Sequence, residues 1–172
     1  EIKHLLHLDT KDVTGVKLGD RLAEPIEWVG RDIIRPVNDP VSPVGGLVAL
    51  RGNIAPDSAI FKRAAATEEL FEVTGRAVVF DGLEDLSNRI DDPELDVKAD
   101  DILVLKNAGP VAAGMPEAGY LPIPKKLSEA GVKDMVRISD ARMSGTAFGT
   151  IVLHIAPEVA VGGPFSAVRS EE

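Results

Sequence analysis

The sequence contains no cysteine among its 172 residues. Disulfides, thiolate metal sites and thiol nucleophiles are therefore excluded, and the chain has no thiolates of its own to bind an iron–sulfur cluster. Aromatic residues make up only 4% of the chain. No apolar run approaches the roughly 20 residues that a membrane-spanning helix needs, so we expect no membrane partner.

Positive charge is also scarce. The chain has 19 Lys and Arg residues against 28 Asp and Glu residues, a net charge of −9, and its basic residues form no stripe. This balance argues against nucleic acid as a partner, and an acidic small substrate would need a local metal ion or arginine to bind against that field. The opening "EIKHLLHLDTKD" has charged residues within its apolar part and lacks the pattern of a secretory signal, so we expect a cytoplasmic protein.

The first 44 residues lack the regular pattern of the remainder. Four prolines interrupt short apolar pieces there: Pro25, Pro36, Pro40 and Pro43. Proline fixes φ and removes a backbone donor, which disfavours regular strands. We predict an irregular lead-in over residues 1–44 that belongs to the same domain as the rest, with one short strand near Ile33 and Ile34.

From Gly45 onward the pattern changes to brief runs rich in Val, Ile and Leu. Six such runs stand out: "GGLVALRG", "RAVVF", "DILVLKN", "DMVRISD", "GTIVLHI" and "FSAVR". Runs of about five such residues suit strands that are buried on both faces or line a barrel. They predict a β-rich domain over residues 45–172.

Short helical signals lie between some of these runs. Asp81 with Glu84 three residues later resembles a capping box, and "PIPKKLSEAG" has a proline at a helix start and Gly131 at its end. A further helix in "FKRAAATEELFEVTG" has good propensity but a weak apolar face. Because the helices are few and short, we predict a β-rich α/β fold, a β-barrel domain with a few short flanking helices, over a doubly wound sheet.

The segment "NAGPVAAGMPEAGYLP", residues 107–122, is the first that could carry chemistry. Its only charged residue is Glu117, with no basic neighbour before Lys125. A metal ion would be a suitable partner for a carboxylate in such a glycine-rich loop. A solvated surface carboxylate is the simpler interpretation.

The segment "RISDARMSGTAFGT" is the second. Ser144, Gly145 and Thr146 form a small-residue loop whose N–H and hydroxyl groups can converge on an anion. A tight turn in which these hydroxyls satisfy their own backbone explains the residues equally well. No histidine lies close in sequence to act as a base for Ser144, and we interpret His154, in a β-type run, as a core residue.

Other polar residues near these segments have several interpretations. Asp140 and Arg142 can pair with each other, bind an acid group or face solvent. In "LRGNIAPDSA", a turn in which Asn53 bonds its own backbone is an adequate explanation.

Long stretches of the chain together resemble one known family. "GGLVALRGNIAPDSAIFK", "DILVLKNAGP" and "GMPEAGYLPIPKKLSEAGVKDMVRISDARMSGTAFGTIVLHIAPEVAVGGPFSAVRS" are similar to the C-terminal domain of the dihydroxy-acid dehydratase and phosphogluconate dehydratase family. The resemblance runs from about Leu6 to the last residue. It implies a hydro-lyase that removes water from a 2,3-dihydroxy acid, and a swivelling, aconitase-like β-barrel domain.

The resemblance also implies groups that this chain does not supply. In the family, an N-terminal domain provides three cysteines for an iron–sulfur cluster and most of a Mg²⁺ site. The chain then looks truncated at both ends, depends on its own N-terminal domain as partner, and is inactive alone. An unpaired strand edge would favour a homo-oligomer.

Three residues match functional positions of the family. Glu117 of "GMPE" matches a magnesium ligand, Ser144 of "RMSGT" matches the base that takes the C2 proton, and Thr146 matches a substrate-contacting hydroxyl. A C–H beside a carboxylate is a very weak acid, and a serine at its ordinary pKa is a poor base. The resemblance therefore implies that metal ions assist both steps.

The amino-acid sequence of one loop suggests the substrate class. "SDARMSGTAFGT" resembles the sugar-acid dehydratases, whereas the branched-chain and phosphogluconate members tend to read "DGRFSGGT" there. We therefore expect an aldonic acid such as arabinonate or xylonate as substrate. The alternatives are the dihydroxy-acid dehydratase of branched-chain amino-acid biosynthesis and a non-catalytic binding module.

Overall fold

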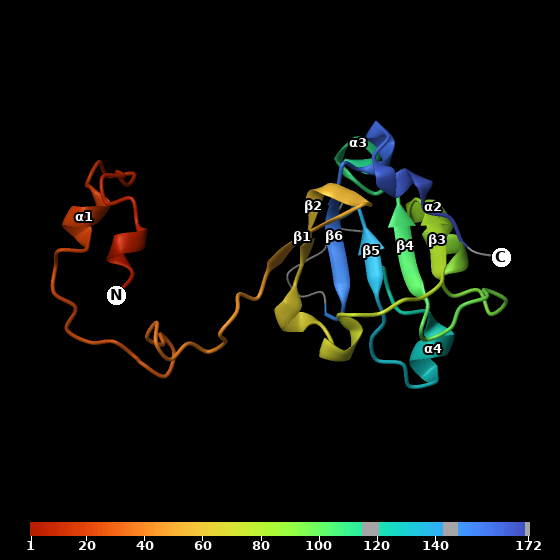
Figure 1. Cartoon of the computed structure of the whole chain (residues 1–172), viewed down its shortest axis with the longest axis horizontal. Coiled ribbons are helices and arrows are strands. Elements are labelled where there is room, and N and C mark those ends of the chain that lie inside the picture. Colours follow the sequence, from red (N-terminus) through yellow and green to blue (C-terminus); the bar gives the residue numbers. More distant parts are fainter. Residues whose placement is uncertain (115–120, 143–147, 171–172) are drawn as a thin grey trace. The chain divides into compact units, whose positions relative to one another are not determined.

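The computed structural model describes residues 1–114, 121–142 and 148–170. It divides the chain into two compact units, Glu1–Val44 and Gly45–Glu172 (Figure 1). That both belong to one domain stays a prediction. Within the described residues, no helix has the length and apolar character that crossing a membrane requires.

The first unit is irregular and contains two short helices, η1 (Lys3–Leu5) and α1 (Leu18–Arg21). Asp12 organises it, because its carboxylate accepts hydrogen bonds from the Thr14 N–H at 2.8 Å and from Arg21 Nε at 2.9 Å. The strand predicted near residues 33–34 is wrong. Both isoleucines are exposed and lie at a turn, since their neighbours provide no sheet to pair with.

The second unit is built on a mixed sheet of six strands in the order β1-β2-β6-β5-β4-β3. The strands are β1 (Val48–Gly52), β2 (Ala55–Phe61), β3 (Ala77–Asp81), β4 (Ile102–Lys106), β5 (Arg137–Ser139) and β6 (Ile151–Ala156). Strands β3, β4, β5 and β6 are parallel neighbours, and β1 and β2 extend the sheet in antiparallel pairing. Five of the six predicted strand segments are thereby confirmed, and β2 continues the first of them after a turn.

The fold class is confirmed as α/β, with few and short helices. The closed barrel is not confirmed, because the strand order in the described residues has β1 at one end and β3 at the other. At the β1–β2 turn, Asn53 accepts the N–H of Ile54 at 3.0 Å. This confirms the turn interpretation of "LRGNIAPDSA".

The two faces of the sheet carry separate apolar clusters. Leu103 and Leu105 of β4 pack in one cluster with residues of β3 and α2, whereas Val104 between them packs in the other. Phe165 completes the second cluster and is fully buried. It belongs to a 3-10 helix, η5 (Pro164–Ala167), so the strand predicted for "FSAVR" is wrong. The segment covers the sheet instead of extending it.

Helix α2 (Leu83–Arg89) follows β3 directly. Its N-cap is Gly82, with φ +97°, and no side chain caps it, so the predicted capping box at Asp81 is wrong. Instead, the Asp85 carboxylate accepts the Asp81 N–H at 2.8 Å and pairs with Arg89 one turn later. The Asp81 carboxylate accepts a hydrogen bond from Asn107 Nδ2 at 2.6 Å.

The other helical predictions had mixed outcomes. Helix α4 (Lys125–Glu129) begins after Pro124 and ends before Gly131, whose φ is +95°, as the sequence predicts. The stretch "FKRAAATEELFEVTG" does not form one helix. It forms two 3-10 turns, η2 (Arg63–Ala65) and η3 (Glu68–Leu70), while a short α3 (Pro110–Ala113) follows β4.

Candidate functional site

The three residues predicted to act in catalysis lie outside the described residues. Glu117 falls within residues 115–120, and Ser144 and Thr146 fall within residues 143–147. The structure does describe the chain on either side of both segments. The candidate site is therefore built from those flanking residues and from the strands that support them.

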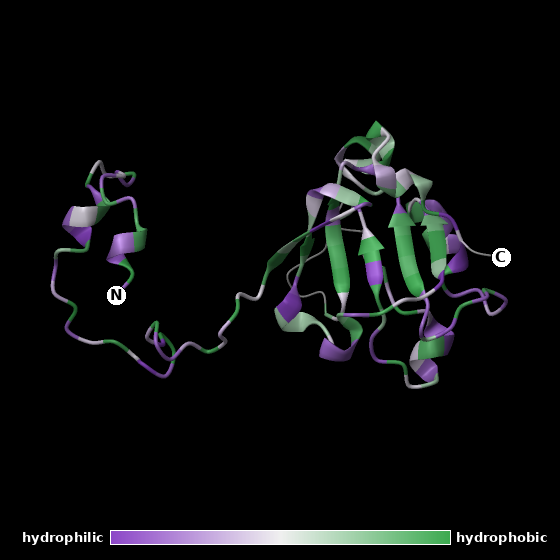
Figure 2. Cartoon of the chain, viewed as in Figure 1, coloured by the Kyte–Doolittle hydropathy of each residue, from purple (hydrophilic) through white to green (hydrophobic). Residues whose placement is uncertain are grey.

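Arg137 lies on β5 and connects the two segments at the points where the described chain resumes. Its side chain is only 3% exposed. Nη1 donates to the carbonyl of Leu121 at 3.1 Å, and Nη2 donates to the carbonyl of Phe148 at 2.9 Å. Leu121 directly follows residues 115–120, and Phe148 directly follows residues 143–147. Figure 2 shows β5 with a hydrophilic segment between the hydrophobic strands β4 and β6.

Asp134 precedes β5 and holds the guanidinium in place, with 3.2 Å between Asp134 Oδ1 and Arg137 Nη2. The same carboxylate accepts the Thr67 hydroxyl at 2.6 Å and the Thr150 hydroxyl at 2.8 Å. Burial by itself raises the pKa of Asp134, but these hydroxyls, the Thr150 N–H and the Arg137 charge outweigh it, so the pKa lies below its ordinary value. We name these four residues, Asp134, Arg137, Thr67 and Thr150, the Asp134 hub.

Gly149 makes room for the Asp134 hub. Its φ is +104°, and a Cβ at this position would lie 2.1 Å from Arg137 Nη2 and 2.4 Å from Asp134 Oδ1. Its N–H donates to the carbonyl of Ala65 at 2.9 Å. The small residues Gly149 and Thr150 of "SGTAFGT" therefore serve the buried ion pair, a role that sequence spacing did not reveal.

Asp140 follows β5 and is 99% buried, with 1% of its surface exposed. Its carboxylate accepts the Ala108 N–H at 3.0 Å and the Val159 N–H at 3.1 Å. The interpretation that Asp140 faces solvent is therefore wrong. Its two hydrogen bonds connect the chain after β4 to the chain after β6. Burial raises the pKa of Asp140, and the charge of Glu158 raises it further.

Glu158 was not singled out by the sequence. It is 8% exposed, and its Oε1 accepts the Val111 N–H at 2.7 Å. Its Oε2 is buried and has no hydrogen-bond partner in the described part of the chain. Asp140 and Glu158 both line a pocket of about 350 Å³, which Pro110 and His154 also border. This pocket therefore concentrates negative charge.

His154 is not a core residue, so the sequence prediction for it is wrong. It is exposed although it lies within β6, and its φ of +54° is unusual for a strand residue. Desolvation by the surrounding chain and the charge of Arg142 lower the pKa of His154. Arg142 is the last described residue before residues 143–147, so positive charge lies at the start of that segment.

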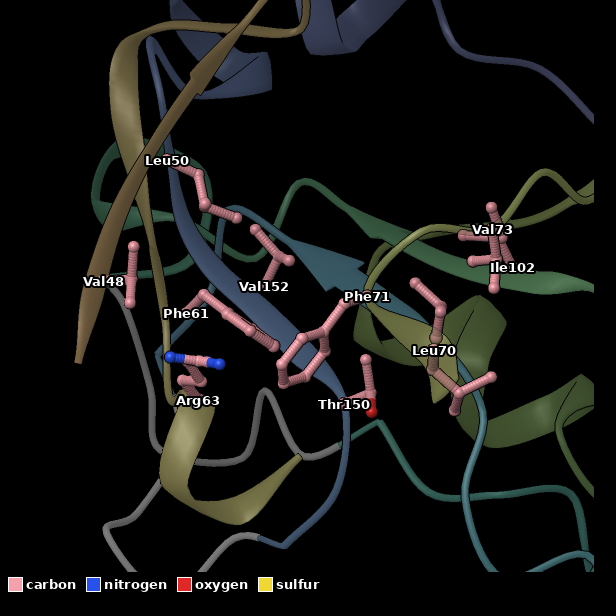
Figure 3. Close-up of a pocket in the computed structure, with 11 residues that line it drawn as sticks. Val48, Leu50, Phe61, Arg63, Leu70, Phe71, Val73, Ile102, Thr150 and Val152 are labelled. Atoms are coloured by element: carbon pink, nitrogen blue, oxygen red, sulfur yellow. The ribbon is translucent and has the colours of Figure 1, made fainter. Parts of the chain in front are cut away.

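A second pocket of about 380 Å³ is lined mainly by apolar side chains (Figure 3). Phe61 and Phe71 meet edge to face there, with ring centroids 5.5 Å apart, and the Arg63 guanidinium lies 5.3 Å from the centre of the Phe71 ring. Thr150 of the Asp134 hub forms part of its wall. Its described lining has no pair of acid and base groups.

No metal site is formed by the residues that the structure describes. Within them, no group of three or more His, Asp or Glu residues is arranged to hold a metal ion. Because the chain has no cysteine, its residues also do not fit an iron–sulfur cluster. The predicted magnesium ligand Glu117 lies outside the described residues.

Comparisons with known proteins identify relatives of this chain. Residues 32–172 match the family model described as "Dihydroxy-acid/6-phosphogluconate dehydratase C-terminal". The chain is 51% identical over 174 residues to a 6-deoxy-6-sulfo-D-gluconate dehydratase of Pseudomonas putida, covering 99% of this chain and 30% of the relative. It is 50% identical over 163 residues to an L-arabonate dehydratase of Azospirillum brasilense, covering 94% and 28%.

Identity to dihydroxy-acid dehydratases is lower. One of them, from Roseiflexus sp. (strain RS-1), is 37% identical over 165 residues, covering 95% of this chain and 28% of the relative. The chain thus spans 28–30% of the length of these three relatives. These matches, together with the α/β sheet and the two flanked segments, show that the chain belongs to the dihydroxy-acid/6-phosphogluconate dehydratase family and corresponds to its C-terminal domain.

Proposed function

We propose that this chain is the C-terminal domain of a sugar-acid dehydratase, a hydro-lyase that converts an aldonic acid such as arabinonate or xylonate to a 2-keto-3-deoxy acid. The two sugar-acid dehydratases named above are 50–51% identical to it, against 37% for the dihydroxy-acid dehydratase. This difference supports the sugar-acid class. The sequence of the "SDARMSGTAFG" loop also supports it.

One geometric observation carries the proposal. The segments that bear Glu117 and Ser144 are separate in sequence, yet the carbonyls of Leu121 and Phe148, where the described chain resumes after each, are bound by one guanidinium. A metal ligand and a base that act on the same substrate need such a common anchor. The Asp134 hub supplies it at the start of β5.

In the proposed reaction, Ser144 removes the proton from C2 and Thr146 contacts the substrate. The electrons of the broken C2–H bond form the C2–C3 double bond, the C3–O bond breaks, and hydroxide leaves as water after protonation. The resulting enol tautomerises to the 2-keto acid. A serine hydroxyl needs nearby positive charge to act as a base, and Arg142 lies two residues before Ser144.

The proposal includes groups outside this chain. It assigns the iron–sulfur cluster, and all of the Mg²⁺ site except Glu117, to an N-terminal domain, and these metals would supply Lewis acidity toward the substrate oxygens. The length of the relatives supports a further domain. A swivelling β-barrel arrangement, a homo-oligomer and a cytoplasmic location belong to the same proposal.

The test is keto-acid formation by the full-length enzyme, assayed anaerobically with Mg²⁺. The substrates are L-arabinonate, D-xylonate, D-gluconate and 2,3-dihydroxyisovalerate. We expect turnover of a sugar acid, and a loss of about 10²–10⁴-fold in Ser144→Ala, the range typical of a general base. The matched control is Ser87→Ala, which removes an exposed hydroxyl on α2 and leaves turnover unchanged.

Each other outcome has a defined meaning. Turnover of 2,3-dihydroxyisovalerate alone would contradict the sugar-acid assignment and favour the branched-chain dehydratase. No turnover of any substrate would favour a non-catalytic binding module. Turnover that survives Ser144→Ala would move the base to another residue.

A further inference from the structure

The ion pair between Asp134 and Arg137 is almost fully buried, with side chains 7% and 3% exposed. Burying two charges is costly, and a buried ion pair is often no more stabilising than apolar side chains of similar volume. Arg137 alternates on β5 with Ile138, which packs in the second apolar cluster, so Arg137 points toward the first cluster. An apolar residue would pack there, which means that stability alone does not account for this arginine.

The guanidinium distributes its donors over separate parts of the chain. Nε donates to the carbonyl of Met135 at 3.3 Å, while Nη1 and Nη2 reach Leu121 and Phe148. A planar guanidinium fixes the relative directions of these bonds, because its N–H groups form a rigid fork. Lysine has a single ammonium at the end of a flexible stem and does not reproduce that fork.

The orientation of the fork is itself fixed. Asp134 binds Nη2, and Thr67 and Thr150 bind Asp134. The Thr150 hydroxyl also accepts the N–H of Thr67 at 3.0 Å. A buried network whose members are bonded to one another restricts the positions of every group it touches.

We propose that Asp134 and Arg137 act together as positioning residues for the dehydration, by setting the distance between the backbone at Leu121 and the backbone at Phe148. The proposal rests on the proposed function, because Glu117 and Ser144 precede these two anchor points. A misplacement of about 1 Å between groups that act on one substrate can lower turnover by about 10²-fold.

The decisive variant is Arg137→Lys in the full-length enzyme, because it keeps the charge and removes the fork. We expect kcat on the sugar acid to fall by about 10²-fold while KM changes by less than about threefold, since misplacement weakens the transition state more than substrate binding. A KM increase with unchanged kcat would overturn the proposal.

Arg76→Lys is the matched control. Arg76 also pairs with a buried aspartate, Asp101, at 2.8 Å, and donates to the carbonyl of Asp96 at 3.0 Å. These partners lie in the chain between β3 and β4, and none of their hydrogen bonds within the described residues reaches Leu121 or Phe148. We expect Arg76→Lys to lower the melting temperature while kcat stays within about twofold. An equal loss of kcat in both variants would overturn the positioning role, because it would report general destabilisation.

A pair of milder variants covers the case in which Arg137→Lys does not fold. Thr67→Val removes the hydroxyl that binds Asp134, and Thr67→Ser retains it. We expect kcat to fall by about tenfold in Thr67→Val and to recover in Thr67→Ser, since one hydrogen bond to a charged group is lost and then restored. Equal activity in both variants would contradict the proposal.

Hydrogen exchange separates this proposal from the proposed function, because it needs no substrate. Peptides covering residues 121–127 and 148–153 should both exchange faster in Arg137→Lys and stay unchanged in Arg76→Lys. Faster exchange in only one peptide, or in neither, would overturn the coupling of the two anchor points. If the wild-type enzyme dehydrates none of the acids, the proposed function fails, whereas exchange still decides whether the anchors are coupled.

Discussion

The two ends of β5 carry aspartates with opposite electrostatics. Before the strand, the pKa of Asp134 lies below its ordinary value because hydroxyl, N–H and guanidinium donors outweigh burial. After the strand, the pKa of Asp140 lies above its ordinary value because burial dominates and Glu158 adds a like charge. Both carboxylates are buried, so burial alone does not set the pKa. The direction depends on whether the donors that the tertiary structure places beside each carboxylate outweigh the effect of burial.

The difference has a structural consequence. At the first end every described charge of the hub has a counter-charge or a donor, so that end can act as a rigid anchor. At the second end Glu158 Oε2 is buried without a hydrogen-bond partner among the described residues. Because the pKa of Asp140 is raised there, that end loses stability as pH rises above the ordinary aspartate pKa.

The largest effect is expected from Asp134→Ala, which would leave Arg137 buried without its counter-charge. We expect the free energy of unfolding to fall by about 3–5 kcal/mol at neutral pH, measured by urea denaturation. Because the pKa of Asp134 is depressed in the folded state, its stabilisation is present above the ordinary aspartate pKa and is lost as pH falls through the folded value. The difference between variant and wild type should therefore shrink in acid.

The control for this variant is Asp57→Ala, which removes an exposed aspartate from β2. We expect its unfolding free energy to stay within about 0.5 kcal/mol of the wild type. A loss of unfolding free energy below about 1 kcal/mol in Asp134→Ala would show that the Asp134 carboxylate does not offset the buried charge of Arg137.

A smaller effect is expected from Gly149→Ala, which places a methyl group against Arg137 Nη2 in a backbone with φ +104°. Steric overlap and the left-handed conformation together should lower the unfolding free energy by about 3 kcal/mol. Gly52→Ala is the control, since nothing lies within 4 Å of a Cβ there. Equal melting temperatures for the two variants would contradict the tight fit at the hub.

The smallest effect, and the only gain, is expected from Glu158→Gln. The amide oxygen can still accept the Val111 N–H, while the charge that raises the pKa of Asp140 is removed. A raised folded pKa means that wild-type stability falls as pH rises above the ordinary aspartate value, so the variant should gain about 1 kcal/mol near pH 8 and less near pH 4.

Thermal denaturation at both pH values measures this gain, with the exposed Glu129→Gln on α4 as control. A gain that is the same at both pH values, or a loss at pH 8, would show that the two carboxylates do not interact as the comparison requires.

Local signals in the sequence predicted those elements whose cause is local. Strands β3 and β4 were found because their apolar runs lie between turn residues, and α4 because Pro124 and Gly131 mark its ends. Elements whose cause is tertiary were missed. "FSAVR" reads as a strand by composition, but Phe165 is needed to cover the second face of the sheet.

The candidate site divides in the same way. The sequence motifs were sufficient to indicate the family, which the comparisons confirm. They also indicated Glu117, Ser144 and Thr146, whose roles stay predictions. No pattern indicated Arg137, because an arginine inside a β-type run resembles any strand residue with a solvated side chain. Its partners Leu121 and Phe148 come from separate segments, and only folding brings them to one guanidinium.

By itself, the sequence determined the family, five of the six strand segments and the absence of thiolate ligands, since these depend on residue identity and local order. The tertiary structure alone decided that donors outweigh burial at Asp134, and that burial outweighs them at Asp140. The physical reason is that burial and the distance between charges arise from contacts between segments far apart in the chain, which local propensity does not encode.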